Sequence, residues 1–193
     1  MADVVVINHV TLDGVMQAPA RPDEDTRDGF AHGGWAIPRN DPLMAAKIGE
    51  RMGDDRAFLF GRRTYEDFYD VWPKQADNPF TEALTNTHKF VASTTLTDPL
   101  PWSNSTLLAG DAATSVAELK RQAAGKLVIF GSGNLIATLM AADLIDEYLL
   151  MIHPLVLGEG HRLFGAGNHT DLRLIDTTTT TSGVLIATYD AHL

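Results

Sequence analysis

The hydrophobic positions of the chain form short apolar runs that alternate with segments of helical period. Three runs of four residues are Val4–Ile7, Ala57–Phe60 and Leu127–Phe130. They are too short for helices and are typical of strands buried on both faces. Asp41-Pro42 predicts an N-cap with proline at the first helical position. The helix that follows is expected to place Met44, Ile48 and Met52 on one face and to end near Gly53.

The remaining segments continue the alternation. Further strands are expected at Phe90–Ala92, Thr106–Leu108 and Tyr148–Ile152, and further helices at Thr64–Tyr69, at Ser115–Ala124 and after Gly131-Ser132-Gly133. The tail, Leu172 to Tyr189, predicts an antiparallel hairpin turning at Ser182-Gly183, in which Thr177–Thr181 is a half-exposed strand. The pattern predicts one α/β domain over residues 1–193, with a mixed sheet flanked by helices.

Composition removes several classes of function. The 193 residues carry 15 Lys and Arg against 25 Asp and Glu, a formal charge of −10, and no basic run, which argues against nucleic acid or an anionic membrane as partner. With no cysteine, a thiolate nucleophile, a zinc–thiolate site and an iron–sulfur cluster are excluded. We find neither a signal-peptide pattern nor an apolar stretch long enough to span a bilayer, so a cytoplasmic protein is expected.

Two expected strand-to-helix junctions carry glycine. They are Phe60-Gly61-Arg62-Arg63-Thr64 and Phe130-Gly131-Ser132-Gly133-Asn134-Leu135. A helix N-terminus offers free N–H groups and a partial positive charge to phosphate, and glycine lets the backbone approach closely. Arg62 and Arg63 add donors and Thr64 adds a hydroxyl. Each junction alone is more typical of an ordinary turn, but the two together favour a ligand with two phosphate-bearing ends.

A dinucleotide is the simplest ligand of this kind. The common Rossmann fingerprint is absent, because the first strand runs into His9-Val10-Thr11 and position 136 is Ile rather than a third glycine. No acidic residue is placed to bind a ribose 2′-hydroxyl, whereas the arginines and Ser93-Thr94-Thr95 favour a 2′-phosphate. The cofactor is therefore predicted to be NADPH. The Walker pattern Gly-Lys-Ser/Thr does not occur.

Two residues are candidates for the substrate side. Asp13 lies in the turn Leu12-Asp13-Gly14 after a buried strand, and it could be catalytic or an ordinary Asp-Gly turn residue. Trp35, after Gly33-Gly34, could wall a planar ligand or anchor its loop to the core. The seven histidines lack metal-ligand spacing and no Gly-x-Ser-x-Gly occurs, so neither a metal site nor a nucleophile elbow is predicted.

Taken in order, these segments resemble the dihydrofolate reductase-like superfamily. The match is closest to the reductase domain of the bifunctional riboflavin-biosynthesis deaminase–reductase and its stand-alone bacterial relatives. The segments that carry it are Thr11–Gly14, Gly33–Trp35, Phe60–Tyr65, Val91–Ser93, Phe130–Leu135, Ile145–Glu147 and Pro154–Phe164. The zinc-binding deaminase half is absent, and the Trp35 loop is similar to that of the stand-alone branch.

The resemblance implies a three-layer α/β/α fold with a mostly parallel mixed sheet and an antiparallel C-terminal hairpin. It also implies NADPH at the two junctions. Gly61, Arg62 and Thr64 match the family's Gly-Arg-x-Thr turn, and Ser93, followed by Thr94, stands beside the 2′-phosphate end. Gly131–Leu135 match the pyrophosphate loop, in which Ser132 replaces a common glycine.

The protein is expected to be an NADPH-dependent reductase. It would transfer hydride to a C=N or C=O carbon of a small substrate of the pterin, pyrimidine or a related heterocycle type. Asp13 is expected to orient the substrate or relay a proton, and substrate would enter between the Trp35 loop and Gly158–Gly160. The alternative is a non-catalytic nucleotide-binding or regulatory protein that retains the fold.

A homodimer is also expected. Val184–Ala187 is an apolar run that an edge strand would avoid exposing, and similar reductase domains often pair as symmetric dimers. The alternative is that this run forms an interior strand of a single sheet.

Overall fold

The computed structural model describes residues 1–75, 78–167 and 169–192. Its strands form one mixed sheet of eight, in the order β4-β3-β2-β5-β1-β6-β8-β7. The chain divides into two compact units, which we describe separately. Unit 1 comprises Met1–Val5 and Met52–Ile145, and unit 2 comprises Val6–Arg51 and Asp146–Leu193.

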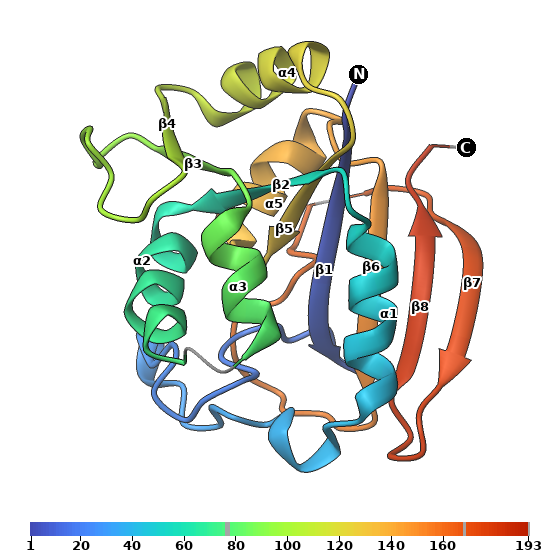
Figure 1. Ribbon diagram of the computed structural model, residues 1–193. Coiled ribbons are helices and arrows are strands. Elements are labelled where there is room, and N and C mark those ends of the chain that lie inside the picture. Colours follow the sequence, from blue (N-terminus) through green and yellow to red (C-terminus); the bar gives the residue numbers. More distant parts are fainter. Residues whose placement is uncertain (76–77, 168, 193) are drawn as a thin grey trace. The chain divides into compact units, whose positions relative to one another are not determined.

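Four parallel strands form the centre of unit 1 (Figure 1). They are β2 (Arg56–Gly61), β3 (Lys89–Ser93), β4 (Ser105–Ala109) and β5 (Lys126–Phe130). The middle residues of β2 and β5 are buried, as expected of apolar strands covered on both faces. Because the strands are parallel, the carboxyl ends of β2, β3 and β5 lie at the same edge of the sheet.

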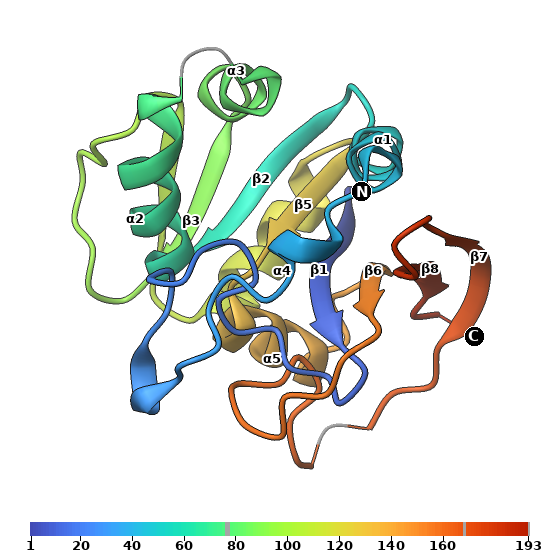
Figure 2. The same ribbon diagram turned by 90° about the horizontal axis from the view of Figure 1, so that it is seen from below.

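Helices cover both faces of these strands. The helical segments of unit 1 are α2 (Arg62–Val71), η3 (Trp72–Lys74), α3 (Pro79–Asn86), α4 (Ala112–Gln122) and α5 (Gly133–Ala141). The chain moves from β2 to β3 through α2 and α3, but from β4 back to β5 through α4. Right-handed crossovers in opposite directions put their helices on opposite faces of a sheet, as Figure 2 shows for α2 and α3 against α4 and α5.

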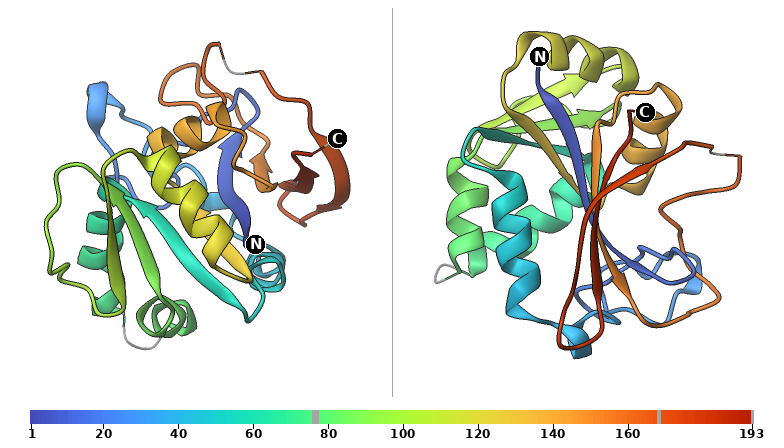
Figure 3. Two further views of the ribbon diagram at one scale, coloured as in Figure 1. Left: turned by 90° about the horizontal axis from the view of Figure 1, so that it is seen from above. Right: turned by 90° about the vertical axis from the view of Figure 1, so that its right-hand side faces the viewer.

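Unit 2 contains the rest of β1 (Asp3–Thr11) together with the antiparallel strands of the sheet. Its other elements are η1 (Arg27–Gly29), η2 (Ile37–Arg39), α1 (Pro42–Met52), β6 (Glu147–His153), β7 (Arg173–Thr179) and β8 (Leu185–Asp190). The hairpin of β7 and β8 appears in red in Figure 3. Asp41 joins this hairpin to α1, because it accepts hydrogen bonds from Leu43 N–H (2.9 Å) and from the Thr181 side chain (2.8 Å).

The expected strands and helices are present, and the largest differences concern α3 and β1. Helix α3 was not expected, although Asn78 caps it by accepting from Phe80 N–H and proline follows at its first position. β1 extends four residues past the predicted run, to Thr11. The predicted C-terminal hairpin is confirmed, and its threonine-rich strand is largely exposed.

The basis for expecting a dimer was partly wrong. β8, which carries the apolar run, pairs with β6 on one side and with β7 on the other, so it is an interior strand. Val184 and Ala187 are fully buried within the chain and require no second subunit. The edge strand beside β8 is β7, where Leu174 and Ile175 are each 52% exposed. The homodimer stays a prediction.

Candidate functional site

The two glycine junctions lie side by side in unit 1. β2 ends at Gly61 and β5 at Phe130, and the two strands pair in parallel with Phe58 opposite Val128. Continuing that register brings Gly61 level with Gly131. The helices that leave these strand ends, α2 and α5, lie on opposite faces (Figure 2). Ligands of open α/β sheets bind outside the carboxyl ends of strands at such a switch point.

Hydrogen bonds tie the junctions to each other. Gly61 N–H donates to Ser132 Oγ (3.0 Å), and Ser132 N–H donates to Thr64 Oγ1 (2.9 Å). Gly131 has a φ of +56°, and a Cβ there would stand 3.3 Å from Thr64 Oγ1. Ser132 follows with a φ of +57°, which is uncommon for a residue with a side chain. The serine that replaces the common glycine therefore holds the junctions together.

The helix N-termini at these junctions differ from those of the other α-helices, α1, α3 and α4. α1, α3 and α4 have N-caps from Asp41, Asn78 and Asp111, whose side chains accept backbone N–H groups. Neither α2 nor α5 receives a side-chain cap, and neither has an acidic residue in its first turn. The first N–H groups of a helix have no intrahelical partner. Those of α2 and α5 are thus suited to an anion.

The other predicted cofactor residues stand at the same sheet edge. Ala92 of β3 pairs with Gly61, so Ser93 and Thr94 lie beside the start of α2. Ser93 Oγ accepts from the N–H groups of Thr95 (3.1 Å) and Leu96 (3.0 Å), and Thr94 is exposed. Arg62 pairs with Glu66 at 2.8 Å in an exposed position.

The last members of the predicted set are Arg63, Gly133, Asn134 and Leu135. Arg63 is exposed in the first turn of α2, and Gly133 and Asn134 begin α5. Leu135 is buried, and a Cβ on Gly61 would lie 3.6 Å from its own Cβ. Its side chain therefore packs the junction. The structure brings the predicted cofactor residues of unit 1 together at one edge.

Asp13, in unit 2, is held by several partners. Its carboxylate accepts from Thr11 Oγ1 (2.6 Å), Leu157 N–H (3.2 Å) and Gly158 N–H (2.8 Å). These bonds, that of Thr11 above all, hold the pKa of Asp13 well below its usual range. Arg162 Nε donates to Asp13 O (2.8 Å). At neutral pH Asp13 is a carboxylate that fixes the Leu157–Gly158 loop.

Trp35 is part of the core of unit 2. The side chain is 6% exposed, its Nε1 donates to Gln17 O (2.7 Å), and it packs with Val15 and Phe30. This favours the loop-anchor interpretation over the ligand wall, because so little of the ring is available to a ligand.

A pair of histidines, His153 buried and His9 half-buried, adjoins Trp35, and the spacing of the histidines in the sequence does not indicate it. His9 Nδ1 and His153 Nε2 are 2.9 Å apart, and the Trp35 and His153 rings meet edge to face with centroids 5.1 Å apart. Burial lowers the pKa of His9 to about 3, with a further contribution from His153. Burial also lowers the pKa of His153 to about 4, with a smaller contribution from Arg39. Both rings are neutral at pH 7.

We expect this pair to make the protein sensitive to acid. Below the ordinary histidine pKa of about 6.5 these two histidines bind protons in the unfolded chain but not in the folded chain. Their contribution to the free energy of unfolding is therefore fully present above that pH and is lost as the pH drops toward 4. Each group contributes at most about 1.4 kcal/mol per pH unit. In urea unfolding experiments between pH 7 and 4.5, the free energy of unfolding should fall less steeply with pH for His153→Leu than for the wild type. His192→Asn, at an exposed histidine, should keep the wild-type slope, and three equal slopes would contradict the expectation.

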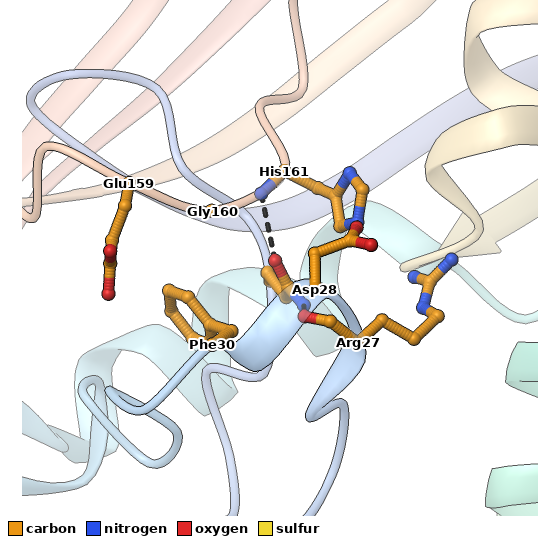
Figure 4. Close-up of a pocket in the computed structure, with 7 residues that line it drawn as sticks. Arg27, Asp28, Phe30, Glu159, Gly160 and His161 are labelled. Atoms are coloured by element: carbon orange, nitrogen blue, oxygen red, sulfur yellow. Dashed lines mark hydrogen bonds and ion pairs between the residues drawn. The ribbon is translucent and has the colours of Figure 1, made fainter.

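A cavity in unit 2 is formed by residues of the predicted substrate-entry loop together with residues for which no role was predicted. It is lined by Gln17, Arg27, Asp28, Phe30, Glu159, Gly160 and His161 (Figure 4). The two segments that form it, residues 17–30 and 159–161, are more than a hundred positions apart, so no local pattern marks it. One of them is the glycine-rich loop at which substrate entry is predicted.

Comparisons with known proteins agree with this picture. The family model described as RibD C-terminal domain matches residues 2–186. The uncharacterized protein YyaP of Bacillus subtilis (strain 168) is 30% identical over 176 residues, which cover 85% of this chain and 89% of that protein.

Solved structures share the fold at low identity. A putative riboflavin biosynthesis protein from Shewanella sp. PV-4 matches with a TM-score of 0.67 at 23% identity, covering 100% of both chains. A pyrimidine reductase-like protein from Corynebacterium diphtheriae matches with a TM-score of 0.61 at 12% identity, covering 100% of this chain and 92% of that one. Dihydrofolate reductase from Enterococcus faecalis, solved with NADP(H), matches with a TM-score of 0.59 at 14% identity, covering 97% and 94%.

Within the described residues, no helix combines the length and the apolar character needed to cross a membrane. The family match spans nearly the whole chain, and the eight-stranded sheet is that of the dihydrofolate reductase-like fold. The chain therefore belongs to the RibD C-terminal domain family, a family of reductases.

Proposed function

We propose that the protein is an NADPH-dependent reductase that binds the cofactor phosphates at the junctions of β2 with α2 and of β5 with α5. The observation that carries the proposal is the pair of uncapped helix N-termini at adjacent parallel strand ends. Gly131 and Gly133 carry no side chain at the second junction, and the neighbour from Enterococcus faecalis was solved with NADP(H).

The preference for NADPH over NADH rests on the start of α2. Arg62 is half-buried, and its ion pair with Glu66 is exposed and therefore weak. A 2′-phosphate carries more charge than Glu66 and can displace that carboxylate from the guanidinium. Ser93 and Thr94, at the end of the neighbouring strand, add hydroxyl groups at the same edge.

The reaction we propose is hydride transfer to a C=N or C=O carbon of a small heterocycle of the pterin or pyrimidine kind. NADPH, when bound, supplies the hydride. The chain's own contribution is to position the reactants and exclude water. Asp13 acts in positioning, because its carboxylate is ionised and holds Leu157 N–H and Gly158 N–H. A proton from solvent completes the reduction.

The test is substrate-dependent oxidation of NADPH with pterin, dihydrofolate and pyrimidine panels. We expect turnover with at least one panel, and a drop of about 10–100-fold in kcat/KM for Asp13→Ala. If Asp13 only positions the loop, the dependence of kcat/KM on pH for Asp13→Ala should keep the wild-type shape above pH 5. If the variant instead lacks an ionisation that the wild-type profile contains, Asp13 would be the residue that relays the proton. NADPH binding without turnover on every panel would favour the non-catalytic alternative.

A further inference from the structure

The histidine pair of unit 2 stands where the strands β1 and β6 end. His9 lies two residues before the last residue of β1, and His153 is the last residue of β6. Beyond the pair the two strand ends stay joined, because Leu12 N–H donates to Leu155 O at 2.9 Å. Ligands of open α/β sheets bind outside the carboxyl ends of strands, so the pair lies at an end of the sheet that is suited to a ligand.

The pair adjoins the two features that are predicted to face the substrate. Side chains alternate along a strand, so His9 and Thr11 lie on the same face of the sheet. Thr11 Oγ1 in turn donates to the Asp13 carboxylate at 2.6 Å. On the other side of the pair, the ring of Trp35 meets that of His153 edge to face. His9 and His153 therefore connect the Asp13 turn with the Trp35 loop.

The fold does not satisfy this polar pair completely. His153 is fully buried, and its Nδ1 has no hydrogen-bond partner in the part of the chain that the structure describes. Trp35 does not provide one, because its Nε1 donates to Gln17 O. A buried polar atom without a partner lowers stability, and an apolar pair at positions 9 and 153 would avoid that cost. The pair is therefore better explained by a function than by stability.

The missing partner indicates which nitrogens carry hydrogen. Burial lowers the pKa of both rings far below 7, so each ring is neutral and has one N–H. A hydrogen on His153 Nδ1 would be a buried donor without an acceptor, and orphaned N–H groups are rarer than orphaned acceptors. We therefore assign the hydrogen of His153 to Nε2, which lies 2.9 Å from His9 Nδ1 and donates to it. The hydrogen of His9 then stands on its own Nε2.

The Nε2–H of His9 is available to a ligand. His9 is half-buried, and among the described residues His153 is the only hydrogen-bond partner of its ring. The partner fixes the ring before a ligand arrives, and a fixed donor in a poorly hydrated place stabilises a developing negative charge well. A neutral imidazole can polarise a carbonyl group in this way without giving up its proton.

We propose that His9 Nε2–H donates a hydrogen bond to the oxygen or nitrogen of the substrate's reactive C=O or C=N group, and that His153 is its positioning residue. The inference rests on the proposed function, because it names the residue that polarises the group to be reduced. When hydride from NADPH adds to the carbon, the electron pair of the double bond moves onto that oxygen or nitrogen, where the bond from His9 strengthens. Solvent supplies the proton, which leaves C–OH or C–NH and NADP⁺.

The first test determines the tautomers by ¹⁵N NMR of histidine-labelled protein at pH 7, without cofactor or substrate. His9→Gln and His153→Gln assign the two sets of signals. We expect the hydrogen on Nε2 in both rings of the wild type. His153→Gln retains an amide N–H near the position of Nε2 and should keep the same tautomer of His9. A hydrogen on His153 Nδ1 would overturn the inference.

The second test measures the binding of pteridine-2,4-dione, a neutral ring with two carbonyl acceptors and no amino group, again without cofactor. The wild type should bind it with a shift of the His9 Nε2–H signal, and His9→Leu should bind it at least about tenfold more weakly. His9→Gln keeps an N–H donor and should stay within about threefold of the wild type. His192→Asn, at an exposed histidine, should bind like the wild type.

No binding of the dione by the wild type, or equal affinity in His9→Leu, would overturn the inference. In turnover, His9→Leu should lower kcat about 100-fold with a smaller change in KM, because the hydrogen bond is strongest in the transition state. An unchanged kcat would also overturn the inference. Absence of turnover by the wild type on every panel would contradict the proposed function, whereas the two cofactor-free measurements judge His9 alone.

Discussion

Substituting alanine for Gly131 is expected to raise the Kd of NADPH at least about tenfold, which corresponds to about 1.4 kcal/mol. The backbone there has a φ of +56°, and the new Cβ would stand 3.3 Å from Thr64 Oγ1 and 3.4 Å from its Cγ2. Moving Thr64 away would break its bond to Ser132 N–H and separate the two junctions. Isothermal titration of the variant with NADPH measures the effect.

Gly110→Ala is the matched control. Gly110 also lies in unit 1 with a positive φ, +88°, but a Cβ there would meet no atom within 4 Å. It carries a similar conformational penalty, about 1 kcal/mol, without touching the junction. Its NADPH affinity should equal that of the wild type. An equal loss of affinity in both variants would show that Gly131 acts through general stability rather than through the phosphate site.

The second large effect is expected at Gly160. Alanine there should lower the free energy of unfolding by about 3 kcal/mol, the sum of backbone strain and overpacking. The φ is +104°, and the new Cβ would approach Phe30 Cε2 to 2.7 Å and Val15 Cγ1 to 2.8 Å. Both side chains are buried in the core of unit 2, so they cannot move aside cheaply. Urea denaturation with a constant m-value gives the loss.

Gly158→Ala separates the two causes of that loss. Gly158 lies in the same loop with a φ of +79°, and a Cβ there would meet nothing within 4 Å. Its substitution should cost only the backbone term, about 1 kcal/mol. Equal losses in the free energy of unfolding at both positions would mean that the glycine-rich loop does not pack on Phe30. The cavity that Phe30 and Gly160 line would then not have the described form.

Local sequence signals were sufficient for much of the fold and for the cofactor junctions. Apolar runs such as Ala57–Phe60 marked buried strands, and the glycines that follow them marked the strand ends. Their adjacency could be expected because parallel strands bring their carboxyl ends to one edge. α3 was predictable too, since Asn78-Pro79 is an N-cap followed by proline.

The substrate side depends on contacts between distant positions and could not be derived in the same way. The partners of Asp13 include Gly158, 145 residues further on, and those of Gln17 include His161, 144 residues further on. β1 continues through the polar His9, and local periodicity does not show that its partner is His153. A polar residue on a buried strand is tolerated only where another element satisfies it, and that element is not visible locally.

The most direct test of the NADPH assignment is a comparison of NADPH with NADH binding in the wild type and in Arg62→Ala. We expect the wild type to bind NADPH at least about tenfold more tightly, since the cofactors differ only in the 2′-phosphate. Removing the guanidinium of Arg62 should erase most of that difference while leaving NADH affinity unchanged. Equal affinity of the wild-type protein for NADPH and NADH would contradict the account.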